Sequence, residues 1–315
     1  MSLAILSVLL ACLCWGLVFI FPIFMHGFNP VEIALGRFFF YGLISLFWLL
    51  FNKRHLLSRS YLKAWKMAVW LGGISTIVGY SGMVFGLHYA NPAVTALIYA
   101  MSPMTIALLG NYRKKEFAFS LFVIPSIFMI LGIVLSNLPA FHYSGESLGW
   151  YVFGLICAVL GLAAWTWYAV ANSHFLSQQS KITVNDWSLM MGSATFILVL
   201  GIGSCFALFM PDVSKFFVFD SAMQTFLIAS IVMGIVSTWL AFFFWNFGSR
   251  KLSIALAGQL MIFEVMFGLI LIYFIEHRFP SFVEILGITC MLAGVLSGCR
   301  ILTMQKDPAE RGLLS

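Results

Sequence analysis

Long apolar segments, separated by short polar ones, run through this chain from end to end. Each apolar run is close to the roughly 20 residues that a helix needs to cross the hydrocarbon core of a bilayer, whereas the strands of membrane barrels alternate over about 10 residues. The pattern therefore predicts an all-α membrane protein. We expect ten transmembrane helices, at residues 3–25, 31–51, 64–87, 93–111, 117–135, 149–173, 187–209, 223–247, 252–275 and 282–302.

The composition excludes a soluble globular protein. Hydrophobic residues make up 62% of the 315 residues, charged residues only 9%, and the mean hydropathy is +1.01, whereas soluble proteins are about a quarter charged. The net charge of +6 comes from Lys and Arg scattered between the apolar runs, so we expect no nucleic-acid partner. The six cysteines lie in apolar segments, where cysteine behaves as a small hydrophobe. We therefore expect no disulfides and no metal site.

The basic residues predict how the chain is oriented in the membrane. Most of the 17 Lys and Arg residues fall in alternate loops on one side, while the other side has Lys215 and Arg278, and Arg37 lies inside the second predicted helix. Because cytoplasmic loops carry the excess of Lys and Arg, both termini are predicted to be cytoplasmic, including a short tail at 304–315. The short loops favour the cytoplasmic (inner) membrane of a bacterium.

The chain also contains an internal repeat. At an offset of 162 residues, Ser75-Thr76 aligns with Ser237-Thr238, Gly86 with Gly248, and Gly132 with Gly294; upstream, Trp15 aligns with Trp165 at an offset of 150. These matches divide the chain into units of five helices at 1–138 and 148–303. Because five is odd, the two units are expected to cross the bilayer in opposite directions, which is the inverted-repeat architecture of secondary transporters.

These residues resemble the EamA-type drug/metabolite transporter superfamily over nearly the full chain. The resemblance begins at Cys14-Trp15-Gly16 and continues through Ser102-Pro103, Glu116 and Gly132 in the first unit, and Trp245-Asn246-Phe247-Gly248, Glu264-Val265, Glu276 and Gly294 in the second. It implies ten helices, a cytoplasmic N-terminus and alternating-access movement of small metabolites, often outward. The chain departs from the family pattern with Ser102 at an acidic position and Val265 at a proline position, and we expect a helix kink near Pro103.

Two ionisable residues lie inside predicted helices. Glu264 lies deep in the ninth helix, and intramembrane charges usually face a cavity or a partner and mark transport pathways. An apolar setting favours the neutral form of a carboxyl group, so Glu264 is a candidate to carry a proton or to pair with a cationic substrate; a protonated, purely structural glutamate is the alternative. Arg37 either binds a substrate carboxylate or serves a structural or gating role near a helix end, and we favour the second reading.

Polar and aromatic residues complete the predicted site. Ser102 is the repeat counterpart of Glu264 and shares a helix face with Tyr99. The matched residues Trp15 and Trp165, with a carboxylate nearby, are the elements of an aromatic box for an amphipathic or cationic ligand; ordinary helix packing is the alternative. The remaining candidates for the cavity are Tyr80, Tyr168, Trp239, Asn246 and Gln259. Five other tryptophans are expected in interface belts: Trp48, Trp65, Trp70, Trp150 and Trp187.

The sequence favours a secondary transporter for a small organic metabolite, with amino-acid export as the first hypothesis and protons as the natural coupling ion. No nucleotide-binding motif or soluble domain is present to hold ATP, and we expect no cofactor. Proton-coupled uptake of an organic cation such as a quaternary amine is the alternative in the same class. An intramembrane lipid-modifying enzyme would need clustered acids or histidines, and a channel would need rings of polar residues; neither pattern is present. We expect a monomer or weak dimer in the bilayer.

Overall fold

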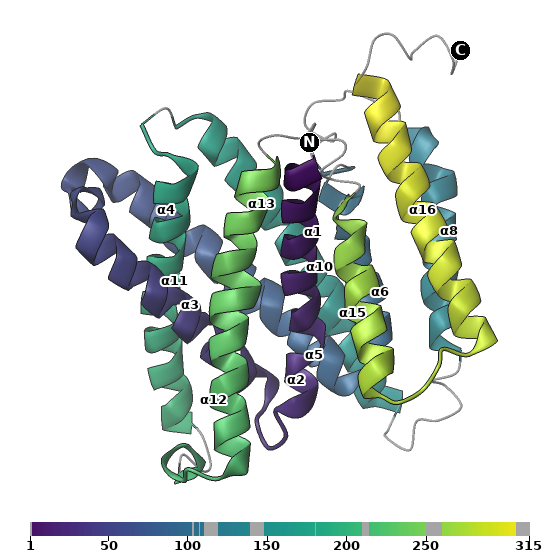
Figure 1. Ribbon diagram of the computed structural model, residues 1–315, viewed down its shortest axis with the longest axis horizontal. Coiled ribbons are helices and arrows are strands. Elements are labelled where there is room, and N and C mark those ends of the chain that lie inside the picture. Colours follow the sequence, from purple (N-terminus) through teal and green to yellow (C-terminus); the bar gives the residue numbers. More distant parts are fainter. Residues whose placement is uncertain are drawn as a thin grey trace.

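The computed structural model (Figure 1) describes residues 2–102, 104–106, 108–109, 119–138, 148–179, 181–209, 214–249 and 260–306, and every regular element in these ranges is helical. Six helices are long and apolar enough to cross a membrane: Ser2–Phe24, Pro30–Asn52, Arg59–Tyr89, Leu148–Leu176, Val184–Leu208 and Ser221–Trp245. Shorter apolar helices are Pro92–Ile106, Ser120–Ser136, Ile262–Ile275 and Phe282–Gly298. The prediction of an all-helical membrane protein is confirmed.

Several of these long helices consist of successive segments. The main elements are α1 (Ser2–Gly16), α2 (Phe21–Phe24), α3 (Pro30–Asn52), α4 (Leu62–Gly72), α5 (Ser81–Tyr89), α6 (Pro92–Ala100), α8 (Val123–Asn137), α10 (Leu148–Ser177), α11 (Val184–Phe209), α12 (Ser221–Gly234), α13 (Ala241–Ser249), α15 (Ile262–Ile275) and α16 (Phe282–Lys306). Pro103, Glu116, Gln259, the basic residues near 114 and 250, and the tail at 307–315 lie outside the described residues.

Two π-helical segments interrupt otherwise α-helical spans. The first, η4 (Gly73–Tyr80), joins α4 to α5, and the second, η7 (Ile235–Leu240), joins α12 to α13. They begin 162 residues apart, at the offset of the sequence repeat. Because π-helical turns are rare and frequently occur at functional sites, the two segments direct attention to the space between them.

Glycines bring several helices into close contact around that space. A Cβ added at Gly82 of α5 would lie 2.5 Å from the carbonyl oxygen of Cys157, and one added at Gly234 of α12 would lie 2.7 Å from that of Arg37. At the other edge of the molecule, α8 and α16 pack side by side (Figure 1), where a Cβ at Gly132 would meet the carbonyl oxygen of Gly287 at 2.7 Å. Small residues of this kind allow backbones to approach within membranes.

Gly161 of α10 is a position at which we expect an added methyl group to be destabilising. A Cβ there would collide with the Tyr99 hydroxyl and would lie 2.7 Å from the carbonyl oxygen of Gly79, and these two groups are hydrogen-bonded to each other. Gly161→Ala is therefore expected to lower the free energy of unfolding by about 1–3 kcal/mol. Gly201→Ala is the matched control, because nothing lies within 4 Å of its added Cβ. Thermal unfolding of the purified variants in detergent measures both, and equal melting temperatures would contradict the close packing of α10 against η4 and α6.

Candidate functional site

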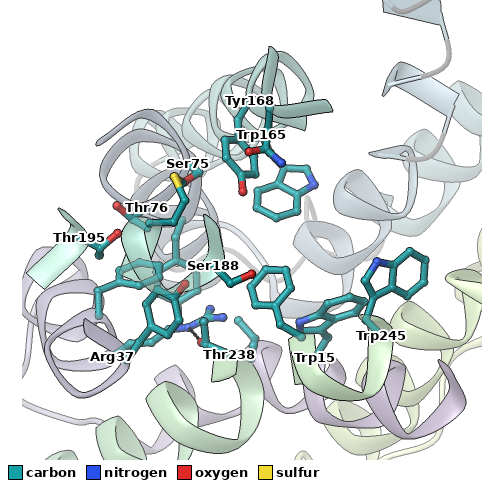
Figure 2. Close-up of a pocket in the computed structure, with 18 of the residues that line it drawn as sticks. Trp15, Arg37, Ser75, Thr76, Trp165, Tyr168, Ser188, Thr195, Thr238 and Trp245 are labelled. Atoms are coloured by element: carbon teal, nitrogen blue, oxygen red, sulfur yellow. Dashed lines mark hydrogen bonds between the residues drawn. The ribbon is translucent and has the colours of Figure 1, made fainter. Parts of the chain in front are cut away.

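A cavity of about 310 Å³ lies between the helices that carry the two π-helical segments. Residues from α1, α3, η4, α5, α6, α10, α11, η7 and α13 line it, together with Met261 and Glu264. Eight of the residues predicted from sequence lie in its wall: Trp15, Arg37, Tyr80, Tyr99, Ser102, Trp165, Tyr168 and Glu264. Residues that are far apart along the chain thus meet at one site, as the close-up in Figure 2 shows for several of them.

Arg37 holds one wall of the cavity in place. Its Nε donates a hydrogen bond to Thr238 Oγ1 at 3.0 Å and its Nη2 donates to the carbonyl oxygen of Ser237 at 3.4 Å. The guanidinium also lies over the ring of Tyr80, 4.2 Å from its centroid, and the residue is only 7% exposed. Because α3 supplies the arginine and η7 supplies both acceptors, Arg37 ties these two elements together while still facing the cavity.

Both π-helical segments use a carbonyl group to bind a side chain from another helix. The Tyr99 hydroxyl of α6 donates to the carbonyl oxygen of Gly79 in η4 at 2.7 Å, just as Arg37 donates to Ser237 in η7. Thr238 also donates its hydroxyl proton to the carbonyl oxygen of Met233 at 2.9 Å. The irregular backbone at the middle of each span is therefore satisfied by polar side chains, which is required of such backbone at membrane depth.

Glu264 supplies the carboxyl group of the cavity. It lies in the first turn of α15, where α15 packs against α1 closely enough that a Cβ at Gly16 would lie 3.2 Å from the carbonyl oxygen of Glu264. Glu264 and Trp15, the neighbour of Gly16, both line the cavity. Within the described part of the chain, the Glu264 side chain makes no hydrogen bond or ion pair, and its repeat counterpart Ser102 lines the same cavity.

Aromatic rings form two opposed walls of the cavity. The Trp15 ring contacts Phe242 edge-on, with centroids 5.8 Å apart, and lies 5.6 Å from the Trp245 ring. The Trp165 and Tyr168 rings are 5.3 Å apart and face that pair from the opposite side (Figure 2). Rings in this arrangement suit an apolar or cationic group placed between them.

Three predicted residues are not placed in the cavity by the structure. Trp239 lies outside it, with its ring 6.5 Å from that of Trp48. Its neighbour Thr238 lines the cavity instead, because the π-helical turns of η7 change the angle between successive residues and shift the face that an α-helical period predicts. Gln259 and the side chain of Asn246 lie outside the described residues.

The cavity also contains residues that the sequence did not identify as site residues. Trp187 was expected in an interface belt, but it is only 3% exposed and its indole N–H donates to the Asn172 side chain at 2.7 Å. Asn172, Trp187 and Ser188 line the cavity near the turn between α10 and α11. Trp245, named only for its place in the family motif, lines the wall next to Trp15. Among the described residues, no group of three or more His, Cys, Asp or Glu side chains could hold a metal ion.

Comparison with known families decides what kind of protein contains this cavity. The EamA-like transporter family matches residues 2–138 and again residues 152–297. The chain belongs to the EamA-like transporter family. This EamA-like protein is therefore a multi-pass integral membrane protein of a transporter family, with a small molecule as the expected cargo.

The relatives of this EamA-like protein are distant in sequence but similar in length. The Inner membrane protein YtfF of Escherichia coli is 23% identical over 94% of both chains. The Aromatic amino acid exporter YddG of Ancylobacter novellus is 24% identical over 75% of this chain and 76% of its own. A protein of known crystal structure superposes with a TM-score of 0.63 at 20% identity, covering 96% of this chain and 99% of the other, which shows a shared fold.

Proposed function

We propose that this EamA-like protein exports a small amphipathic metabolite, with aromatic amino acids as the first candidates, across a bacterial inner membrane by alternating access. The observation that carries the proposal is the cavity itself, because it combines one guanidinium, Arg37, and one carboxyl group, Glu264, with opposed aromatic walls. A zwitterion with an aromatic side chain complements all three features. The name of the relative YddG supports the same class of cargo, and no enzymatic step is needed.

The lining of the cavity supports two inverted five-helix units, at 1–138 and 148–303, as the basis of alternating access. Most lining residues fall into pairs related by the repeat offsets. At 150 residues the pairs are Trp15/Trp165, Val18/Tyr168, Arg37/Trp187, Phe38/Ser188 and Tyr41/Met191; at 162 residues they are Thr76/Thr238, Tyr80/Phe242, Met83/Trp245, Tyr99/Met261 and Ser102/Glu264. Such pairs are expected where equivalent helices surround a site on a pseudo-two-fold axis in the membrane plane. In the same proposal the chain has ten transmembrane helices and both termini in the cytoplasm, and works as a monomer or weak dimer.

The paired positions differ in charge, so each unit contributes a different charged group to the proposed site. Arg37 of the N-terminal unit is paired with Trp187, and Glu264 of the C-terminal unit is paired with Ser102. The cation and the carboxyl group therefore come from different units, and a ligand that contacts both joins the two units. We propose that Glu264 also exchanges a proton with the aqueous side of the membrane to which the cavity is open. A carboxyl group in an apolar site is neutral more readily than one in water.

One observation favours a second candidate, the uptake of an organic cation such as a quaternary amine. Two nitrogens of Arg37 already donate to Thr238 and Ser237, which reduces its capacity to bind a carboxylate. The tryptophan rings and Glu264 then remain as a cage for a cation. The two candidates make opposite predictions about which compounds are exchanged.

Counterflow in proteoliposomes separates the candidates. Native protein is reconstituted with unlabelled phenylalanine, tryptophan or choline inside, and the uptake of the same labelled compound from outside is measured. We expect exchange of the two amino acids and not of choline. Exchange of choline alone would replace the proposal with cation uptake, and exchange of none of the three would contradict both candidates.

A further inference from the structure

An ion pair joins the two halves of the chain where α3 begins. Lys215 Nζ lies 2.8 Å from both carboxylate oxygens of Glu32 and donates to the carbonyl oxygen of Gly27 at 3.2 Å. Lys215 lies in η6 (Ser214–Phe217), in the connection between α11 and α12. The Glu32 side chain is only 1% exposed and that of Lys215 is 32% exposed. Because Glu32 is buried and Lys215 is only partly exposed, this pair is a more specific contact than an ion pair between two exposed side chains.

Aromatic rings from both halves surround this ion pair. The ring of Phe28, in the turn before α3, stacks on Phe226 of α12 with centroids 4.1 Å apart and 19° between planes. It also lies 5.9 Å from the ring of Phe216, and Lys215 Nζ lies 5.2 Å from its centroid. Phe28 and Phe226 are buried. Phe216 and Phe226 also contact each other, with centroids 6.2 Å apart, so one ring of the first half and two rings of the second half form a single cluster.

This cluster lies directly beyond one end of the cavity. Arg37 follows Glu32 by five residues on α3, which is about 7.5 Å along the helix axis. At the other end the cavity is lined by Leu176, Val184 and Ser188, which flank the turn between α10 and α11. The cavity therefore extends from the level of Arg37 toward the turn between α10 and α11, and the cluster at the start of α3 lies outside its lining.

A related ion pair is found at that opposite face. Lys53, directly after α3, lies 3.1 Å from Asp186 in the first turn of α11. Glu32 and Asp186 both belong to helix-start motifs. The backbone N–H of Asn29 donates to the Glu32 carboxylate, and the Asn29 side chain accepts from the Glu32 backbone N–H. In the same way, the Thr183 hydroxyl donates to the Asp186 carboxylate and accepts from the Asp186 backbone N–H. Each helix thus begins with a carboxylate that binds a lysine beyond the end of the other helix. Beside Asp186, the rings of Phe175 and Trp187 lie 4.7 Å apart, and Tyr61 and Trp65 of the N-terminal half pack against the same cluster.

We propose that the Lys215–Glu32 pair and Phe28 form the gate on the membrane face that has few basic residues, and that this gate is closed in the present conformation and must open to release the cargo. The proposal rests on the proposed carrier function. Breaking the Lys215–Glu32 pair shifts the population toward opening at that face.

Glu32→Gln tests this gate without disturbing the helix start. Glutamine keeps the hydrogen bond to the Asn29 backbone N–H, as in other capping boxes, but removes the charge that Lys215 binds. The reporter is Ser102→Cys in a chain whose six native cysteines are replaced, because Ser102 lines the cavity. A membrane-impermeant maleimide is applied from each side of oriented vesicles. We expect Glu32→Gln to raise the labelling rate from the Lys215 side by about tenfold.

Glu284→Gln is the matched control, because Glu284 also belongs to a helix-start motif, with Ser281, and binds Arg278, but lies on α16 outside the cavity lining. Its labelling rate is expected to equal that of the native background. Lys215→Gln is a second variant that leaves the helix start untouched, and it is expected to match Glu32→Gln. Unchanged labelling in both gate variants, or an equal rise in the control, would overturn the proposal. The readout needs no substrate, so a failure of amino-acid exchange would count against the carrier function and not against the gate.

Discussion

Replacement of Glu264 by glutamine is expected to abolish pH-driven accumulation of the cargo and to weaken exchange without abolishing it, because the glutamine amide oxygen still accepts a hydrogen bond from the cargo's ammonium group. Glutamine keeps the size of the side chain but cannot bind and release a proton, so the proposed coupling step is lost. The cavity, its aromatic walls and Arg37 remain. Uptake of labelled phenylalanine into proteoliposomes, with and without a pH gradient, measures both properties in the same preparation.

Glu276→Gln is the control for this prediction. Glu276 is a carboxylate outside the cavity that pairs with Arg278 at 2.7 Å, and its replacement is expected to leave accumulation unchanged. If Glu264→Gln accumulates the cargo as the native protein does, Glu264 is not the proton site. If it loses exchange as well as accumulation, the carboxylate binds the cargo and its proton-coupling role is unsupported.

Arg37→Gln is expected to lower the exchange rate by at least about tenfold. The change removes the guanidinium donors to Thr238 Oγ1 and to the Ser237 carbonyl oxygen, and a hydrogen bond to a charged group contributes about 1.5–3 kcal/mol. The effect is expected in both affinity and maximal rate, because Arg37 faces the ligand and also holds η7 to α3. Exchange measured over a range of phenylalanine concentrations separates the two.

Arg37→Lys separates charge from geometry at this position. Lysine keeps the positive charge but lacks the planar fork that contacts Thr238 and Ser237 together. Activity intermediate between the native protein and Arg37→Gln is expected. Thr238→Val removes one of the two acceptors of Arg37, together with the hydroxyl that donates to Met233, and is expected to have a smaller effect. Native exchange rates in both arginine variants would contradict a role for Arg37 in the site.

The spans were predictable because the thickness of the bilayer sets their length. The second predicted helix illustrates this: the sequence predicts a helix at 31–51, and α3 covers Pro30–Asn52. The additional residue at its start, Pro30, follows the cap at Asn29, which a hydropathy pattern does not register. The π-helical segments η4 and η7 were not predicted, because glycine and β-branched residues at these positions are equally compatible with an α-helix.

The site was predictable where a residue was unusual for its depth in the membrane. A carboxylate at Glu264 or a guanidinium at Arg37 is costly in hydrocarbon and therefore conspicuous in an apolar run. Aromatic residues give no such signal, because a tryptophan near a helix end is typical of the membrane interface. The sequence therefore predicts Trp187 at the interface and Trp239 in the cavity. In the structure Trp187 lines the cavity, whereas Trp239 lies outside it, near Trp48.

Exchange of labelled phenylalanine by native protein, Trp165→Ala and Trp239→Ala tests most directly whether the central cavity is the transport site. Both variants remove a tryptophan from the middle of a span, but only Trp165 lines the cavity. The account predicts exchange by the native protein, a loss of at least about tenfold in Trp165→Ala, as expected when a stacking ring is removed, and near-native exchange in Trp239→Ala. Equal exchange by all three proteins, or a larger loss in Trp239→Ala, would contradict it.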